Sequence, residues 1–212
     1  WIESRLQATV AEVNQLLDSY EFSEATRLLY RFVWNEFCDW YVEIAKMRLY
    51  GDDEGEKQQV SAHLLHLLDT ILRLLHPFMP FLTEELAALT PGREGYLIQA
   101  EYPRADESAR DPEAEKDMEE LMETITAIRA LRNELGVSPK KEAHAVLVSA
   151  DEKVRNVVQF NASLIESLSK TVLVECVAEE SQASAAGEQS AVALIPGGKL
   201  LVPLAELIDI EA

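Results

Sequence analysis

The sequence has little cysteine, no long hydrophobic run and no secretion signal, and each shortage argues against a class of protein. Only two cysteines, Cys38 and Cys176, occur among the 212 residues, and they lie far apart. This spacing excludes a disulfide framework or a cysteine-rich metal site. No apolar stretch is long enough to cross a bilayer, and no signal peptide is present. The sequence therefore predicts a reduced, cytoplasmic chain without a membrane partner.

Basic residues are also scarce. The chain has 19 lysines and arginines against 38 acidic residues, so its formal net charge is −19. The excess is spread evenly, because residues 1–110 hold 10 basic and 19 acidic side chains and the remainder hold 9 and 19. Taken alone, this balance argues against a nucleic-acid binder, since phosphate contacts need clustered cations. A general contribution to solubility explains the charge equally well.

The short motifs of common enzymes are missing as well. We find no phosphate-binding loop, dinucleotide fingerprint, nucleophile elbow or zinc-hydrolase motif. His63, His66 and Asp69 share one predicted helix, and such residues can bind metal. However, they lie on the polar side of that helix, and no further ligand is evident, which favours a solvated face. We predict no catalytic residue and no metal site in this chain.

Hydrophobic residues at helical spacing predict a helical bundle. Its clearest element is a long aromatic helix over residues 21–50, placed at the bundle centre because apolar side chains cover most of its circumference. Gly51 ends this helix, and the acidic residues from Asp52 onward favour the start of another. A short helix follows over residues 81–89, and Asp111 with Pro112 begins a further one that ends at Gly136.

After Gly136 the spacing of apolar residues changes. Residues 143–148 and 171–177 favour strands, and the apolar stretch 154–168 between them favours a helix. Two short apolar runs flank Pro196-Gly197-Gly198, which predicts a β-hairpin. The expected fold is mainly α, with a helical bundle over residues 1–136 followed by a small α+β subdomain over residues 137–212.

Two features are compatible with RNA. The basic residues Arg129, Arg132, Lys140 and Lys141 fall within about a dozen positions, as phosphate binding requires, although a solvated helix end is the simpler explanation. Six aromatic residues between Tyr30 and Tyr41 could stack on unpaired bases. Their helical spacing places most of them in the core, so that only one or two at a helix edge remain free.

The residues themselves resemble a known family. Residues 28–43, LLYRFVWNEFCDWYVE, closely resemble the long helix in the anticodon-binding domain of bacterial-type valyl-tRNA synthetases. Residues 76–86, HPFMPFLTEEL, are similar to a run shared with the isoleucine and leucine enzymes, whereas the Trp-x-x-Phe-Cys-Asp-Trp-Tyr pattern is typical of valine. Residues 128–141 and 201–211 resemble the segments after the bundle and before the family's C-terminal coiled-coil arm. The chain departs from the family at Ala87, where a large aromatic is usual.

This resemblance implies a non-catalytic anticodon-binding bundle within a valine–tRNA ligase. ATP and Mg²⁺ would bind an upstream catalytic domain, and the partners would be that domain and the valine tRNA, in a cytoplasmic, monomeric enzyme. The alternatives are the isoleucine or leucine enzyme, or an acidic helical scaffold for protein partners. The predicted phosphate contacts are Arg27, Arg31, Lys46, Arg48, Arg129, Arg132, Lys140 and Lys141.

Overall fold

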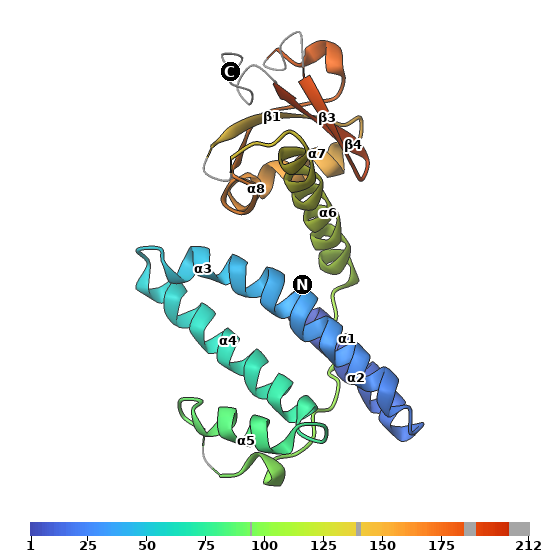
Figure 1. Cartoon of the computed structure of the whole chain (residues 1–212), viewed down its shortest axis with the longest axis vertical. Helices are drawn as coiled ribbons and strands as arrows, with labels where there is room; N and C mark the ends of the chain where they lie inside the picture. Colours follow the sequence, from blue (N-terminus) through green and yellow to red (C-terminus); the bar gives the residue numbers. More distant parts are fainter. Residues whose placement is uncertain (94, 139–140, 185–189, 204–212) are drawn as a thin grey trace. The chain divides into compact units, whose positions relative to one another are not determined.

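A computed structural model describes the chain except residues 94, 139–140, 185–189 and 204–212 (Figure 1). The chain forms two compact units, residues 1–115 and 116–212. This division falls near the start of the helix Pro112–Glu134, so most of that helix belongs to the second unit. The sequence-based boundary at residues 136 and 137 follows the same helix and stays a prediction of domain organisation.

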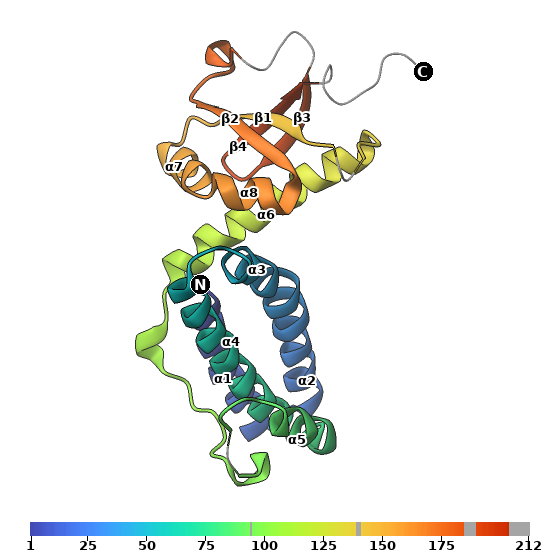
Figure 2. The same cartoon turned by 90° about the vertical axis from the view of Figure 1, so that its left-hand side faces the viewer.

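The first unit consists of helices joined by short turns and one long connection. Helix α1 packs against α2 and the segment after it, and α4 packs against α3 and α5 (Figure 2). The core between α1, the long helix and α4 is apolar, with Leu6, Leu29, Phe32 and Leu67 at most 1% exposed. The helices are α1 (Ile2–Asp18), α2 (Phe22–Arg31), the π-helical η1 (Phe32–Val42), α3 (Glu43–Leu49), α4 (Glu54–Leu75) and α5 (Pro80–Ala88).

The predicted long helix is confirmed as a continuous helical run from α2 through η1 to α3. Arg31, Phe32 and Glu43, which join its segments, all keep right-handed helical dihedral angles. Its central part is π-helical, a rare and wider winding that occurs often at functional sites. Its expected position at the bundle centre is wrong, because α1 and α4 cover one side while Tyr30 and Trp34 on another side stay exposed.

Local signals in the sequence account for the ends of the helices. Asp53 caps α4, and its carboxylate accepts hydrogen bonds from the backbone N–H groups of Gly55 and Glu56. Pro80 occupies the first turn of α5, where its missing N–H leaves no bond unmade. Among its described residues, the connection over residues 89–111 contains the short turns η2 (Leu97–Gln99) and η3 (Glu107–Ala109) and no longer helix.

A charged network joins three parts of the first unit. The Arg5 guanidinium donates two hydrogen bonds to Glu36 of η1, at 2.7 and 2.8 Å. The Arg5 guanidinium also lies 3.4 Å from the Glu115 carboxylate. Glu115 in turn accepts a hydrogen bond from Ser4 and forms an ion pair with Arg110. These carboxylates are less than one-fifth exposed, so the charges are largely withdrawn from water.

The second unit is a four-stranded sheet with helices. Strands β1 and β2 pair in parallel, and β4 pairs antiparallel with both β1 and β3, in the order β2-β1-β4-β3. The parallel pair requires a crossover, which α7 and α8 supply. The elements are α6 (Pro112–Glu134), β1 (Ala143–Val148), α7 (Glu152–Phe160), α8 (Ala162–Ser169), β2 (Thr171–Val177), η4 (Glu180–Gln182), β3 (Ser190–Ile195) and β4 (Gly198–Pro203).

Two elements of this unit, a hairpin and a helix, were predicted from the sequence and can be compared with the structure. The predicted hairpin is confirmed: Gly197 takes a left-handed φ of 70°, and a Cβ on Gly198 would lie 2.6 Å from the Val148 carbonyl oxygen. The predicted single helix over residues 154–168 is two helices, because Asn161 leaves the helical conformation and its side chain donates to the Val157 carbonyl. The expected class, a helical bundle followed by a small α+β subdomain, is confirmed.

Candidate nucleic-acid interface

The outer side of the long helix carries exposed aromatic and basic side chains together. Leu28, Leu29 and Phe32 point into the core, at 8, 1 and 1% exposed, and thereby orient the helix. Tyr30 and Trp34, four positions apart, are 62 and 56% exposed. Their rings stack, with centroids 6.3 Å apart and planes inclined by 13°.

Arg27 and Arg31 belong to the same helical turns as this aromatic pair. Arg27 forms an ion pair with Glu24 at 2.8 Å, and both side chains are about half exposed or more. Such surface pairs contribute little to stability, so the Arg27 guanidinium can exchange Glu24 for a phosphate at low cost. Arg31 is exposed and has no ion pair within the part of the chain that the structure describes.

Lys46 and Arg48 lie farther along the same helical run, on α3. Lys46 bonds to Glu43 at 2.5 Å, and this hydrogen bond raises the pKa of the lysine. Arg48 is exposed and lines a cavity of about 260 Å³ together with Glu56 and His63. All four cations predicted on this run are therefore on the surface, although Arg27 and Lys46 form ion pairs with acidic neighbours.

The histidines of α4 take part in hydrogen bonds. His63 Nδ1 lies 2.7 Å from the Tyr41 hydroxyl, and its Nε2 lies 3.3 Å from Glu3. His66 also approaches Glu3, at 3.5 Å. Burial raises the pKa of Glu3, but the hydrogen bonds from Gln7 and His63 outweigh it, so the net shift is downward. No group of three or more potential metal ligands occurs among the described residues.

One arginine of the basic cluster predicted in the second unit is buried and not exposed. Arg132 is only 7% exposed, and its guanidinium donates to the carbonyls of Lys170, Ser138 and Lys141, at 3.0, 3.2 and 2.5 Å. Burial lowers the pKa of Arg132. Because Arg132 is buried and its guanidinium makes three hydrogen bonds inside the protein, we correct its role to a structural one.

Arg129 is exposed but also donates from Nε to a carbonyl, that of Leu168, at 2.9 Å. Lys141 is half-buried, and its backbone carbonyl serves Arg132. Lys140 lies outside the described residues. The helical spacing of Arg129 and Arg132 reflects contacts with the end of α8, where carbonyl groups lack helical partners.

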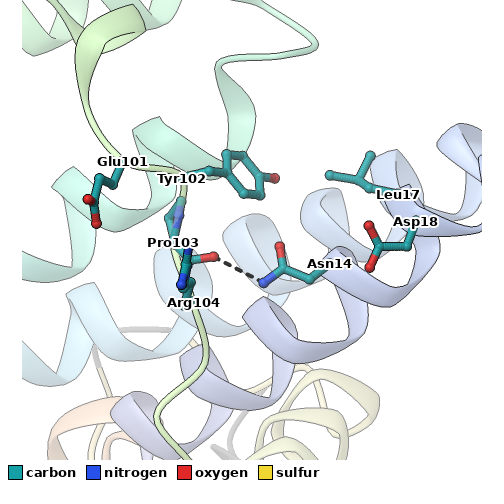
Figure 3. Close-up of a pocket in the computed structure, with 7 residues that line it drawn as sticks. All are labelled: Asn14, Leu17, Asp18, Glu101, Tyr102, Pro103 and Arg104. Atoms are coloured by element: carbon teal, nitrogen blue, oxygen red, sulfur yellow. Dashed lines mark hydrogen bonds between the residues drawn. The ribbon is translucent and has the colours of Figure 1, made fainter.

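The larger cavity, of about 590 Å³, lies beside α1 and the connection (Figure 3). Its lining mixes charges of both signs, with Asp18 and Glu101 against Arg104. The Asn14 side chain donates to the Pro103 carbonyl at 3.0 Å and thereby holds the connection on α1. Burial raises the pKa of Tyr102 to about 12. These features indicate a packing contact.

Sequence reasoning missed two parts of this arrangement. It predicted that one or two aromatic side chains would be free at a helix edge, but it did not identify Tyr30 and Trp34. Helical spacing relative to Leu29 and Phe32 would have placed both on the outer side. The ion pairs of Arg5 had no comparable signal, because Glu36 and Glu115 are remote from Arg5 in sequence.

Comparison with known proteins defines the class. Residues 1–147 match the model of the anticodon-binding domain of tRNA ligases, and the chain belongs to this family. The predicted resemblance to valyl-tRNA synthetases is confirmed over the whole chain. It is 41% identical to the valine–tRNA ligase of Enterococcus faecalis, 37% to that of Bacillus licheniformis and 35% to that of Bacillus subtilis, each time over 100% of this chain.

The chain spans about a quarter of the length of these relatives, 24% in each case. The similarity favours the valine branch over the isoleucine and leucine alternatives and over an acidic scaffold. In the part of the chain that the structure describes, no helix is long and apolar enough to cross a membrane.

Proposed function

We propose that this chain is the module of a valine–tRNA ligase that binds the anticodon stem and loop of its tRNA. The single observation that carries this proposal is the exposed strip on α2 and η1, where Arg27 and Arg31 accompany the stacked rings of Tyr30 and Trp34. Guanidinium groups suit phosphate oxygens, and aromatic rings suit unpaired bases. Membership of the anticodon-binding family supports the same function.

The proposed surface consists of Arg27, Arg31, Lys46 and Arg48, with Arg129, Lys140 and Lys141 as a second, weaker region. Arg132 is left out, because its guanidinium already serves three carbonyl groups. The net charge of −19 opposes RNA binding at long range, so these local cations have to act at short range. We therefore expect tRNA affinity to fall steeply with salt.

The chemistry of the longer enzyme belongs elsewhere. We propose that a catalytic domain outside this chain activates valine with ATP and Mg²⁺ and transfers it to the tRNA bound here. This chain would contribute binding and no catalytic group. The names of the relatives support the ligase activity. We further propose a monomeric, cytoplasmic enzyme, and the two free cysteines agree with a reducing compartment.

A charge-reversal experiment on the full-length protein tests this function. The variant Arg31→Glu, Arg48→Glu should weaken binding of the valine tRNA by about tenfold or more, because two phosphate contacts become repulsions. The control Arg104→Glu, Lys116→Glu has the same net charge but alters exposed cations outside the proposed surface. Valine-dependent pyrophosphate exchange should be unchanged in both proteins.

Equal tRNA affinities for the variant and the control would contradict the proposed surface. Pyrophosphate exchange with isoleucine or leucine in place of valine would contradict the assignment to the valine branch. Absence of tRNA binding by the unmutated protein, together with capture of a protein partner, would favour the scaffold.

A further inference from the structure

Tyr30 and Trp34 differ from Phe32 and Phe37, which lie beside them on the long helix. Phe32 and Phe37 are 1 and 8% exposed and belong to the core. Tyr30 and Trp34 lie outside that core cluster, and their main aromatic contact is with each other. Their planes are inclined by only 13°, and more than half of each side chain is exposed, so two nearly parallel rings lie at the surface.

Packing within the chain does not account for this arrangement. Aromatic pairs four positions apart stabilise a helix by only about 0.2–0.5 kcal/mol, whereas exposed apolar patches on a soluble protein mark binding sites. Trp34 also lies in η1, and π-helical segments occur often at functional sites. The pair therefore has the properties of a contact surface.

The neighbours of the pair indicate the chemistry of its ligand. Arg31 follows Tyr30 directly, Arg27 lies one turn before it, and Asn35 follows Trp34; all three are exposed. An apolar protein segment would leave these polar groups poorly matched. A nucleotide offers a flat π-system for the rings and an anionic phosphate for the guanidinium groups, so charge complementarity favours it.

We propose that Tyr30 and Trp34 form a platform on which an unpaired RNA base stacks, while Arg31 contacts the adjoining phosphate. This inference rests on the proposed tRNA binding and adds the residues that read the single-stranded part. Because every base has a π-face, the platform distinguishes unpaired from paired nucleotides and leaves base identity to other groups. A paired stem exposes only base edges and phosphates, so the rings of Tyr30 and Trp34 add nothing to its binding affinity.

The test measures binding of the full-length protein to two RNAs: the anticodon stem-loop of the valine tRNA, and the same stem closed as a continuous duplex. Trp34→Ala should weaken binding of the stem-loop by about tenfold and that of the duplex by less than about twofold. Trp34→Phe keeps an aromatic face and should restore affinity to within about threefold. Tyr50→Ala removes a ring that is 82% exposed at the end of α3, and it should leave both affinities unchanged.

A stem-loop with one abasic loop position identifies the stacked base. When the abasic position is that of the stacked base, Trp34→Ala should no longer lower the affinity for the stem-loop, because the base that stacks is already missing. The thermal midpoint of Trp34→Ala should match that of the unmutated protein, since the side chain is more than half exposed.

The outcomes separate the two proposals. If the unmutated protein binds neither RNA, the proposed function itself fails. If it binds the stem-loop and Trp34→Ala reduces stem-loop and duplex affinity equally, or reduces neither, tRNA binding stands and the platform is overturned. A large fall in the thermal midpoint of Trp34→Ala would assign the ring to packing and would likewise overturn the platform.

Discussion

Arg27 and Arg31 in the first unit and Arg129 and Arg132 in the second have similar helical spacing but different partners. Arg27 and Arg31 are exposed on a helix whose other side faces the core. Arg129 and Arg132 donate to backbone carbonyl groups, and Arg132 is 7% exposed. Spacing determines which face of a helix two side chains share, but it does not determine what covers that face.

The second pair is held by the end of another helix. Arg129 donates to Leu168 and Arg132 to Lys170, both at the carboxyl end of α8, where Lys170 itself adopts a left-handed conformation. The last carbonyl groups of a helix lack intrahelical partners and carry partial negative charge. A guanidinium group supplies both hydrogen-bond donors and positive charge, so these arginines hold α6 against α8.

The largest effect is expected where an arginine is most enclosed. Arg132→Ala should lower the free energy of unfolding of the second unit by about 3 kcal/mol, because the substitution leaves three partly buried carbonyl groups without this donor. Arg129→Ala, which removes an exposed side chain, should lower the free energy of unfolding by about 1 kcal/mol. Urea unfolding of the two variants measures both values. Equal costs would contradict the distinction between them.

A smaller effect is expected in the charged network of the first unit. Arg5→Ala should cost about 2 kcal/mol in the free energy of unfolding, since it removes the ion pair of the partly buried Glu36 and one of the two arginines that pair with Glu115. Burial raises the pKa of Glu115, but the hydrogen bond from Ser4 and the charges of Arg110 and Arg5 together lower it below the ordinary 4.5. The stabilisation from Glu115 is therefore present above that value and is lost as the pH falls through the lowered pKa.

This pH dependence can be measured by thermal unfolding from about pH 6 down to about pH 3. Glu115→Gln should lower the thermal midpoint near pH 6 and flatten its decline in acid, because the variant has no carboxylate at this position to protonate. Asp106→Asn is a suitable control, since Asp106 is exposed and also has a lowered pKa, caused by hydrogen bonds from Ser108. A decline in Glu115→Gln as steep as in the unmutated protein would exclude Glu115 as its source.

The smallest effect on stability is expected for the exposed arginine. Arg31→Ala should change the free energy of unfolding by less than about 0.5 kcal/mol, as is usual for surface positions. Its effect should appear instead in RNA binding, where the slope of log affinity against log salt should decrease by about one. Filter binding of tRNA at several salt concentrations measures this slope. An unchanged slope would leave Arg31 without a role in phosphate contact.

Much of the fold follows from short-range signals. Asp53 and Asp111 cap helices because their carboxylates accept from the N–H groups that follow, and Pro196-Gly197-Gly198 turns a hairpin because glycine tolerates a left-handed backbone. The break between α7 and α8 at Asn161 was harder to predict. The apolar residues on either side keep helical spacing, and the break depends on one polar side chain bonding to its own backbone.

The candidate site was predictable only in part. The sequence indicated that Arg27 and Arg31 share a helix and that few aromatic residues could be free. It could not indicate that Arg132 is enclosed, since the three carbonyl groups that accept its hydrogen bonds come from a loop and from the end of α8. Partners of this kind are peptide groups, which are identical at every position and leave no trace in the sequence.

The sequence by itself determined the helices, the hairpin and the family, because each depends on residue types at close spacing. Tertiary structure decided which charged and aromatic side chains reach solvent, because that depends on which elements pack over them. Tyr30 and Trp34 are exposed since α1 and α4 cover another side of their helix, and Arg132 is enclosed since the end of α8 lies over it.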